Sequence, residues 1–179
     1  MATTTKWVID PMHSEVEFKV KHLVISTVTG FFKEFEGQVI TESEDFQDSE
    51  IDFSINVSSI DTNQEARDKH LIGPDFFDAE KFPKMNFKST SLKKVDNKDY
   101  KLTGDLTVKG MTKTVSFDVD FGGTASDFYG NTKAGFEIIG KINRKEFGLS
   151  WDGVTDAGSI VVGEDIKLVV NAQFTKETA

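Results

Sequence analysis

Apolar and polar residues alternate along most of the chain, with the period of two that is typical of β-strands with one buried face. In residues 15–22 (EVEFKVKH), the apolar residues and His22 share one face, and the other charged residues share the opposite face. The same alternation recurs in residues 31–40, 51–57, 85–91, 100–108, 115–121, 134–142 and 166–174. About eight strands with one wet face each predict an antiparallel sheet, because strands of a parallel sheet are buried on both faces.

Turn-forming sequences separate the predicted strands. Thr29-Gly30 precedes the segment 31–40, and further turns are predicted at residues 96–99, 109–112 and 122–131. The chain contains no internal repeat, low-complexity tract or linker. We therefore expect one domain over residues 1–179, with its core in about residues 7–174.

A sheet with one apolar face can pack on a second sheet as a sandwich, or it can close on itself as a barrel. A closed barrel of about eight strands can hold one small ligand. The 16 Phe, against 2 Tyr and 2 Trp, indicate a large dry interior or a large dry ligand. Small residues at inward positions predict unfilled space beside these rings. They are Gly104, Gly140, Ala134, Ser89 and Ser91.

One helix is predicted, over residues 63–72. Thr62 and Glu65 have the spacing of a capping box, and Glu65 and Lys69 can form an i,i+4 ion pair. Gly73-Pro74 ends the helix. The Phe-rich segment 76–83 follows, so that the helix and this segment form a natural lid over one barrel mouth.

Composition excludes several classes of function. The chain has no Cys, which rules out disulfides, thiolate catalysis and Cys-ligated metals. The net charge of −9 argues against nucleic-acid binding and against docking on anionic lipid. No apolar run of membrane-spanning length occurs, so we do not expect an integral membrane protein. The first residues lack the apolar stretch of a signal peptide, which predicts a cytoplasmic protein, or a periplasmic one whose leader has been removed.

The residues that could carry catalysis form no recognisable active-site pattern. His13, His22 and His70 lack the close spacing of zinc ligands, and no Gly-x-Ser-x-Gly sequence is present. Asp75 and Asp78 are interpreted as turn residues in a chain with 30 acids. We therefore expect neither catalytic residues nor a metal site. His22 is expected to face inward at a strand end, near a ligand head group.

Arg67 and Arg144 are notable because lysine supplies most of the positive charge. Arginine is favoured where a partly buried, bidentate interaction is needed. One interpretation is a salt bridge at the barrel end, for instance from Arg67 to Asp10 or Asp68. The other is contact with an anionic head group. The acidic composition favours the first interpretation, and it leaves a neutral or phenolic head group at least as plausible as an anionic one.

Several motifs together resemble those of the YceI-like family. The most specific is the segment 67–77 (RDKHLIGPDFF), since no general β-barrel requires that order of residues. The other motifs are Asp10-Pro11-x-His13-Ser14, Phe18, His22, Gly30, Phe32, Phe82-Pro83, Leu102-x-Gly104-x-Leu106-Thr107-x-x-Gly110 and Arg144-x-x-Phe147-Gly148-Leu149. The resemblance covers nearly the whole chain.

The resemblance implies an all-β fold: a single lipocalin-like antiparallel β-barrel of about eight strands, with a short helix and a Phe-rich loop at one end. It also implies binding of a polyisoprenoid or similar long-chain lipid in the lumen, as carrier, buffer or scavenger, without another cofactor. The residues expected to line the lumen are Val16, Phe18, Val20, His22, Phe53, Ile55, Phe87, Leu102, Gly104, Leu106, Phe117, Phe136, Ile138, Gly140, Leu168 and Val170. The lid and head-group region is expected to contain Arg67, His70, Leu71, Phe76, Phe77 and Phe82.

Two alternative functions stay open. One is an enzyme that modifies an isoprenoid or quinone-precursor lipid, and the other is a structural barrel whose lumen is filled by side chains. The oligomeric state is also open, with a homodimer among the options.

Overall fold

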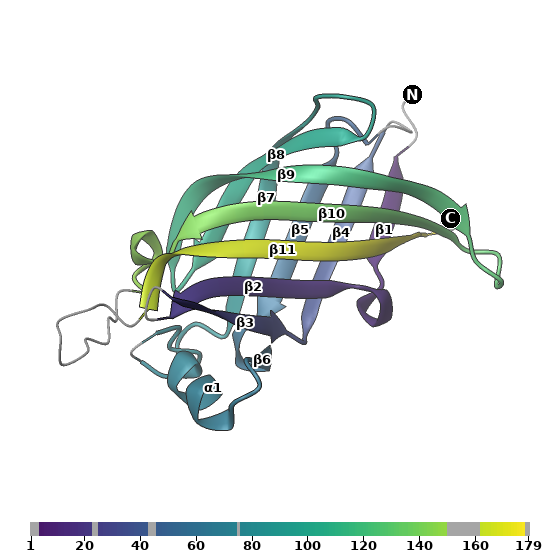
Figure 1. Ribbon diagram of the computed structural model, residues 1–179. Helices are drawn as coiled ribbons and strands as arrows, with labels where there is room; N and C mark the ends of the chain where they lie inside the picture. Colours follow the sequence, from purple (N-terminus) through teal and green to yellow (C-terminus); the bar gives the residue numbers. More distant parts are fainter. Residues whose placement is uncertain (1–3, 23–24, 43–45, 75, 150–161, 178–179) are drawn as a thin grey trace.

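The strands of the protein form one sheet in a computed structural model that describes residues 4–22, 25–42, 46–74, 76–149 and 162–177. The strands are β1 Thr5–Ile9, β2 Glu15–His22, β3 Ser26–Phe32, β4 Phe35–Thr41, β5 Glu50–Asn56, β6 Ile60–Asp61, β7 Lys84–Lys94, β8 Asp99–Val108, β9 Met111–Ser126, β10 Thr132–Asn143 and β11 Val162–Lys176. The helical segments are η1 Pro11–His13, η2 Val57–Ser59, α1 Glu65–Ile72 and η3 Arg144–Phe147. Figure 1 shows the long strands β9, β10 and β11 crossing one wall, with α1 at one end.

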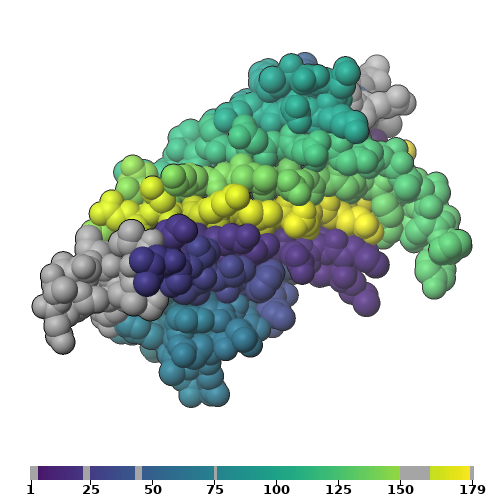
Figure 2. Space-filling view, in the orientation of Figure 1, coloured from purple at the N-terminus to yellow at the C-terminus, as the bar shows by residue number. Residues whose placement is uncertain are grey.

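The sheet closes into an eight-stranded antiparallel barrel, which confirms the predicted fold class. The strand order is β1-β4-β5-β7-β8-β9-β10-β11, and β1 pairs with both β4 and β11. Trp7 lies opposite Val39 on one side and Lys176 on the other. Closure leaves the barrel strands without a free edge at this point. The wall made by β9, β10, β11 and β2 is continuous in Figure 2.

β2, β3 and β6 extend the wall at the end of the barrel where α1 lies. β1 and β2 pair with successive parts of β11, and η1 joins them. The backbone N–H of Asp10 at this bend donates to the Gln173 carbonyl at 2.7 Å. β6 pairs with the end of β3, which brings the start of α1 to the same mouth.

Most predicted strands are present with the predicted inward face, but one predicted turn is wrong. Thr29-Gly30 lies inside β3, where Gly30 pairs with Phe18, and the chain turns after Phe32 instead. The turn predicted within 122–131 is present at residues 127–131, whereas Gly122 and Gly123 lie inside β9, which runs to Ser126. Glycine at these positions accommodates neighbouring groups and a bulge rather than a turn, and a local sequence signal does not distinguish these roles.

The predicted helix is present, but the predicted capping box is wrong. The N-cap of α1 is Gln64, which makes no side-chain capping bond. Asn63 has a φ of 64°, and its N–H donates to the Asp61 carboxylate at 2.9 Å, so a turn separates Thr62 from the start of α1. The predicted ion pair between Glu65 and Lys69 is present at 3.1 Å. Among the residues that the structure describes, no helix has the length and apolar character needed to span a membrane.

An aromatic cluster closes the end of the barrel opposite α1. Phe46 is 2% exposed, and its ring centroid lies 5.3 Å from Trp7, 5.3 Å from Phe121 and 5.1 Å from Phe136. Phe46 has a φ of 64°, and its carbonyl accepts hydrogen bonds from the N–H and the hydroxyl of Ser49. A bulky residue in the left-handed region is uncommon, and here the burial of its ring offsets the backbone cost.

Phe46→Ala is expected to lower the free energy of unfolding by about 3–5 kcal/mol, because it removes the ring at the centre of this cluster. Phe128→Ala is the matched control, since Phe128 is fully exposed, and should change stability by no more than about 0.5 kcal/mol. Urea-induced unfolding of both variants measures the difference. Equal stability of the two variants would contradict the assignment of Phe46 as the plug of this end.

Candidate ligand-binding cavity

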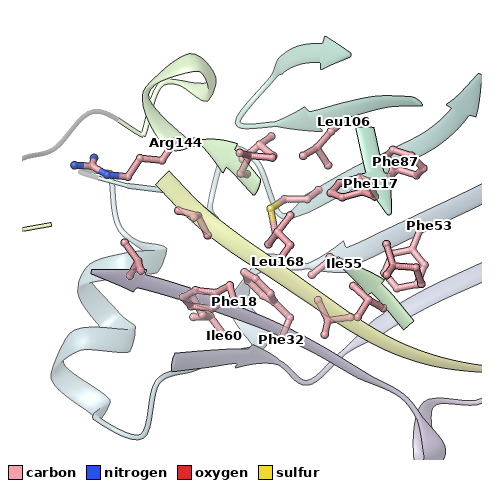
Figure 3. Close-up of a pocket in the computed structure, with 18 of the residues that line it drawn as sticks. Phe18, Phe32, Phe53, Ile55, Ile60, Phe87, Leu106, Phe117, Arg144 and Leu168 are labelled. Carbon is pink, nitrogen blue, oxygen red and sulfur yellow. The ribbon is translucent and has the colours of Figure 1, made fainter. Parts of the chain in front are cut away.

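The interior of the barrel contains a cavity of about 640 Å³. This volume lies within the range of sites that bind one small ligand. Most of the lining is aliphatic or aromatic, contributed by strands from around the whole barrel. In Figure 3 the labelled Phe and Leu side chains approach one another from opposite walls, and Arg144 lies at one end.

Most of the residues predicted to face the lumen line this cavity. They are Val16, Phe18, Val20, Phe53, Ile55, Phe87, Leu102, Leu106, Phe117, Phe136, Ile138, Leu168 and Val170. The period of two was therefore sufficient to identify them, because every second side chain of a barrel strand points inward. The side chain of His22 lies outside the described part of the chain.

Gly104 and Gly140 do not line the cavity, and the interpretation that they mark empty space is wrong. A Cβ atom on Gly104 would lie 2.5 Å from Phe87 Cζ, and one on Gly140 would overlap the ring of Phe117. Gly37 receives the ring of Phe53 in the same way. Each glycine therefore lets a phenylalanine ring lie against the wall, and the cavity stays open because the rings do not project across it.

The other small residues do not border open space either. The register of β7 against β8 shifts between Ser89 and Ser91, and this bulge returns Leu92 to the inside, where it lines the cavity. Ser89 instead accepts a hydrogen bond from the backbone N–H of Ile51 at 2.8 Å. Ala134 is buried but is not a lining residue. A bulge reverses the parity of a strand, so alternation alone assigns the wrong face beyond it.

The predicted lid region covers the mouth at the α1 end. Arg67, His70 and Leu71 of α1 line the cavity, as do Phe76 and Phe77 after the helix. The ring of Phe76 makes an edge contact with His70 at 5.3 Å. The Phe77 N–H donates to the Leu71 carbonyl at 3.0 Å, which fixes this segment to the helix.

Phe82 was predicted to belong to the lid, but it does not line the cavity. Its ring packs beside Gly110 in the turn between β8 and β9, where a Cβ would lie 2.9 Å from the ring. Asp78 adopts a left-handed conformation, and its carbonyl accepts from the N–H of Phe82 at 2.9 Å, which fits the predicted turn role. Asp75 lies outside the described residues.

The sequence pattern missed lining residues that lie outside the alternating segments. Phe46 is the main example, because it follows an acidic stretch and has no periodic neighbour. A single Phe in such a stretch is a weak signal of burial. Ile60 lines the cavity from the very short β6, which carries too few residues to show a period.

Arg144 has a structural role at the cavity mouth. It is 1% exposed, and its guanidinium donates to the carbonyls of Gly163 at 2.7 Å, Leu149 at 2.5 Å and Val162 at 3.1 Å. A buried arginine needs such acceptors, since an unpaired buried charge is costly. The side chain thereby joins η3 to the start of β11.

Arg67 does not form the predicted salt bridge with Asp10 or Asp68 in the described residues. Its Nε donates to the Thr62 hydroxyl at 2.7 Å, and its Nη2 donates to the Thr62 carbonyl at 2.5 Å. The Thr62 hydroxyl in turn donates to Asp68 at 2.5 Å. Asp10 lies far along the barrel and pairs with Lys133 at 3.3 Å. Arg67 is thus held through a hydroxyl rather than a carboxylate.

Two carboxylates in the described residues have perturbed pKa values, and both lie away from the cavity. Burial raises the pKa of Asp10, but hydrogen bonds from His13, Lys133 and the Met12 N–H outweigh it and leave the pKa below its ordinary value. The backbone N–H of Asn131 is the main cause of the lowered pKa of Asp127. Neither residue is a lining residue. No group of His, Asp and Glu in the described residues is arranged to hold a metal ion.

The fold and the cavity define a closed antiparallel β-barrel with an apolar interior and one polar mouth. The model of the YceI-like domain matches residues 7–174, and the chain belongs to the YceI-like family. A UPF0312 protein of Staphylococcus aureus (strain USA300) is 36% identical over 172 residues, which cover 96% of this chain and 98% of the relative.

Solved structures of similar proteins agree with the fold. The YCEI protein of Campylobacter jejuni is 33% identical, with a TM-score of 0.74 over 88% of this chain and 90% of that one. BcnA of Burkholderia cenocepacia is 23% identical, with a TM-score of 0.80 over 92% and 98%. A polyisoprenoid binding domain from Saccharophagus degradans, implicated in plant cell wall breakdown, is 12% identical, with a TM-score of 0.69 over 96% and 98%. The last two comparisons show the fold alone.

Gly140→Phe is expected to displace the ring of Phe117 into the cavity, and so to reduce ligand uptake while costing about 1–3 kcal/mol of stability. Gly135→Phe on the same strand is the matched control, because a Cβ there meets nothing within 4 Å. Native mass spectrometry of both variants measures bound ligand, and thermal unfolding measures stability. Undiminished ligand in a folded Gly140→Phe protein would show that the cavity does not depend on the Phe117 ring position.

Proposed function

We propose that the protein binds a polyisoprenoid or similar long-chain amphiphilic lipid inside the barrel, as a carrier, buffer or scavenger. The observation that carries this proposal is the cavity of about 640 Å³ with its apolar lining. Such a lining offers no hydrogen bonds along its length, so it suits a hydrocarbon chain, which gains free energy by leaving water. The similarity in fold to the polyisoprenoid binding domain of Saccharophagus degradans supports this choice of ligand.

The distribution of polar lining residues also fits an amphiphile. In the described part of the chain they are Lys21, Thr62, Gln64, Arg67, His70 and Arg144. They come from the end of β2, from η3 and from the region of α1, all at one mouth. A ligand with an apolar chain and one polar head would place the head there. The aromatic cluster around Phe46 closes the other end of the barrel, so the apolar chain of the ligand would end there.

Binding without turnover is the form of the proposal that the lining favours. Covalent or acid–base catalysis needs a nucleophile with a base, or a pair of acid and base groups, directed at the substrate. The described lining contains no Asp, Glu, Ser or Cys, and the hydroxyl of Thr62 is hydrogen-bonded to Arg67 and Asp68. The alternative of a filled structural barrel conflicts with the size of the cavity.

Native mass spectrometry of the purified protein tests the proposal directly. We expect a non-covalent lipid that is lost on organic extraction and is chemically unchanged after long incubation with the protein. Protein that carries no lipid and takes none up from a total lipid extract would contradict the proposal. Conversion of the lipid would instead support the enzymatic alternative.

Replacing Phe76 and Phe77 together by Ser is expected to speed lipid dissociation, because both rings line the cavity at its mouth. The effect should lie mainly in the dissociation rate, as for most changes at a binding interface. Asp78→Asn is the matched control, since Asn tolerates the left-handed conformation at this position. Dissociation of a fluorescent fatty acid measures both variants. Faster dissociation of the fatty acid from the Asn variant than from the Ser variant would overturn the lid assignment.

A further inference from the structure

Every charged residue that lines the cavity in the described part of the chain is basic. These residues are Lys21, Arg67 and Arg144, and no Asp or Glu is among them. The side chain of Lys21 is exposed on the outward face of β2, so Arg67 and Arg144 are the buried or partly buried cations of this lining. The whole chain has 30 acidic residues against 21 Lys and Arg. A lining assembled without regard to charge would therefore hold carboxylates more often than cations. The basic lining of an acidic protein needs a specific explanation.

The three basic residues lie on separate elements around one mouth. Lys21 is near the end of β2, Arg67 is on α1, and Arg144 begins η3. α1 lies at this end of the barrel in Figure 1, and Figure 3 shows Arg144 at the edge of the group of apolar side chains. Because the opposite end is closed by the Phe46 cluster, the polar head of a bound lipid would face these cations.

Arg67 keeps hydrogen-bonding capacity for a ligand. A guanidinium has five N–H donors, and the contacts of Arg67 with Thr62 use only Nε and Nη2. Lys21 differs, because its Nζ donates to the Thr27 hydroxyl at 3.3 Å on the exposed face of the sheet. Within the described ranges, no carboxylate lies at ion-pair distance from Arg67, since the ion pairs there involve other residues.

Basic residues just outside the mouth behave differently. Lys69 lies two residues from Arg67 on α1, and its amine pairs with Glu65 at 3.1 Å. Lys145 follows Arg144, and its amine pairs with Glu164 at 3.3 Å. Carboxylates therefore neutralise Lys69 and Lys145 on the outer surface of these elements but not Arg67 at the cavity.

We infer that the bound lipid has an oxyanion head group, a carboxylate or a phosphate, that is held by Arg67 at the mouth. This inference rests on the proposed function, because it assigns the head group of the lipid in the same cavity. Arg67 is oriented in advance by its two bonds to Thr62, so little ordering is lost when Nη1 donates to an oxyanion. Charge-assisted hydrogen bonds of this kind are stronger than neutral ones, and the low-dielectric cavity strengthens them further.

Two matched pairs of ligands test the inference. Palmitate is compared with hexadecanol, and geranylgeranyl diphosphate with geranylgeraniol, by calorimetric titration at low salt. We expect the anion of at least one pair to bind about tenfold or more tightly than its alcohol, an advantage that falls as salt rises. The pair with the larger advantage identifies carboxylate or phosphate. Equal binding of acid and alcohol in both pairs would overturn the inference and leave the proposed function intact, whereas binding of none of the four would contradict the proposed function.

Variants of α1 assign the effect to Arg67. Arg67→Gln should remove most of the advantage of the anion over the alcohol, while Arg67→Lys should retain part of that advantage. Lys69→Gln removes the same charge from the same helix and should have little effect, because its amine faces Glu65. An equal loss in Lys69→Gln and Arg67→Gln would show a general charge effect and overturn the inference. If Arg67→Gln also loses the alcohol, Arg67→Lys decides the question: complete loss of the anion advantage in this variant, which keeps the charge, would overturn the inference.

Discussion

The hollow interior depends on phenylalanine rings that lie against glycines of the wall. Phe18 lies over Gly30, Phe53 over Gly37, and Phe117 over Gly140. A side chain at any of these glycines would push the ring toward the barrel axis, where the opposite wall supplies its own aromatic residues. The pairs thus give the wall a dense apolar surface without filling the lumen, and they explain how 16 Phe residues are compatible with a cavity of about 640 Å³.

The two ends of the barrel have opposite chemistry. One end is closed by rings packed around Phe46, so a ligand chain has no exit there. The other end carries the mouth, where α1 and the segment after it add Arg67, Phe76 and Phe77 to the lining. An amphiphile has the same polarity as this barrel, with an apolar chain and one polar head, so its orientation follows from the protein alone. The membership of the YceI-like family and the apolar cavity thus agree on the kind of ligand to test first.

Strand alternation predicted most of the fold and of the cavity lining, because burial of one face is a local property of each strand. The motif around residues 67–77 led to the family, and the ion pair between Glu65 and Lys69 followed from helical spacing. The pattern was wrong where a local signal has two structural meanings. Glycine at position 30 accommodates the ring of Phe18 rather than a turn, and Thr62 orients Arg67 rather than capping α1.

The sequence by itself determined that this chain forms strands with one apolar face, and which side chains point inward along them. Only the tertiary structure decided how the barrel closes, because closure requires the short β1 to pair with strands from both ends of the chain, β4 and β11. It also decided that Phe46 plugs one end and that Arg67 and Arg144, from two separate elements, line the other. These features bring together residues that are far apart in the sequence, so the alternation of apolar and polar residues within one strand cannot predict them. A pattern specifies which face of a strand is buried, but the folded chain decides which faces share one interior.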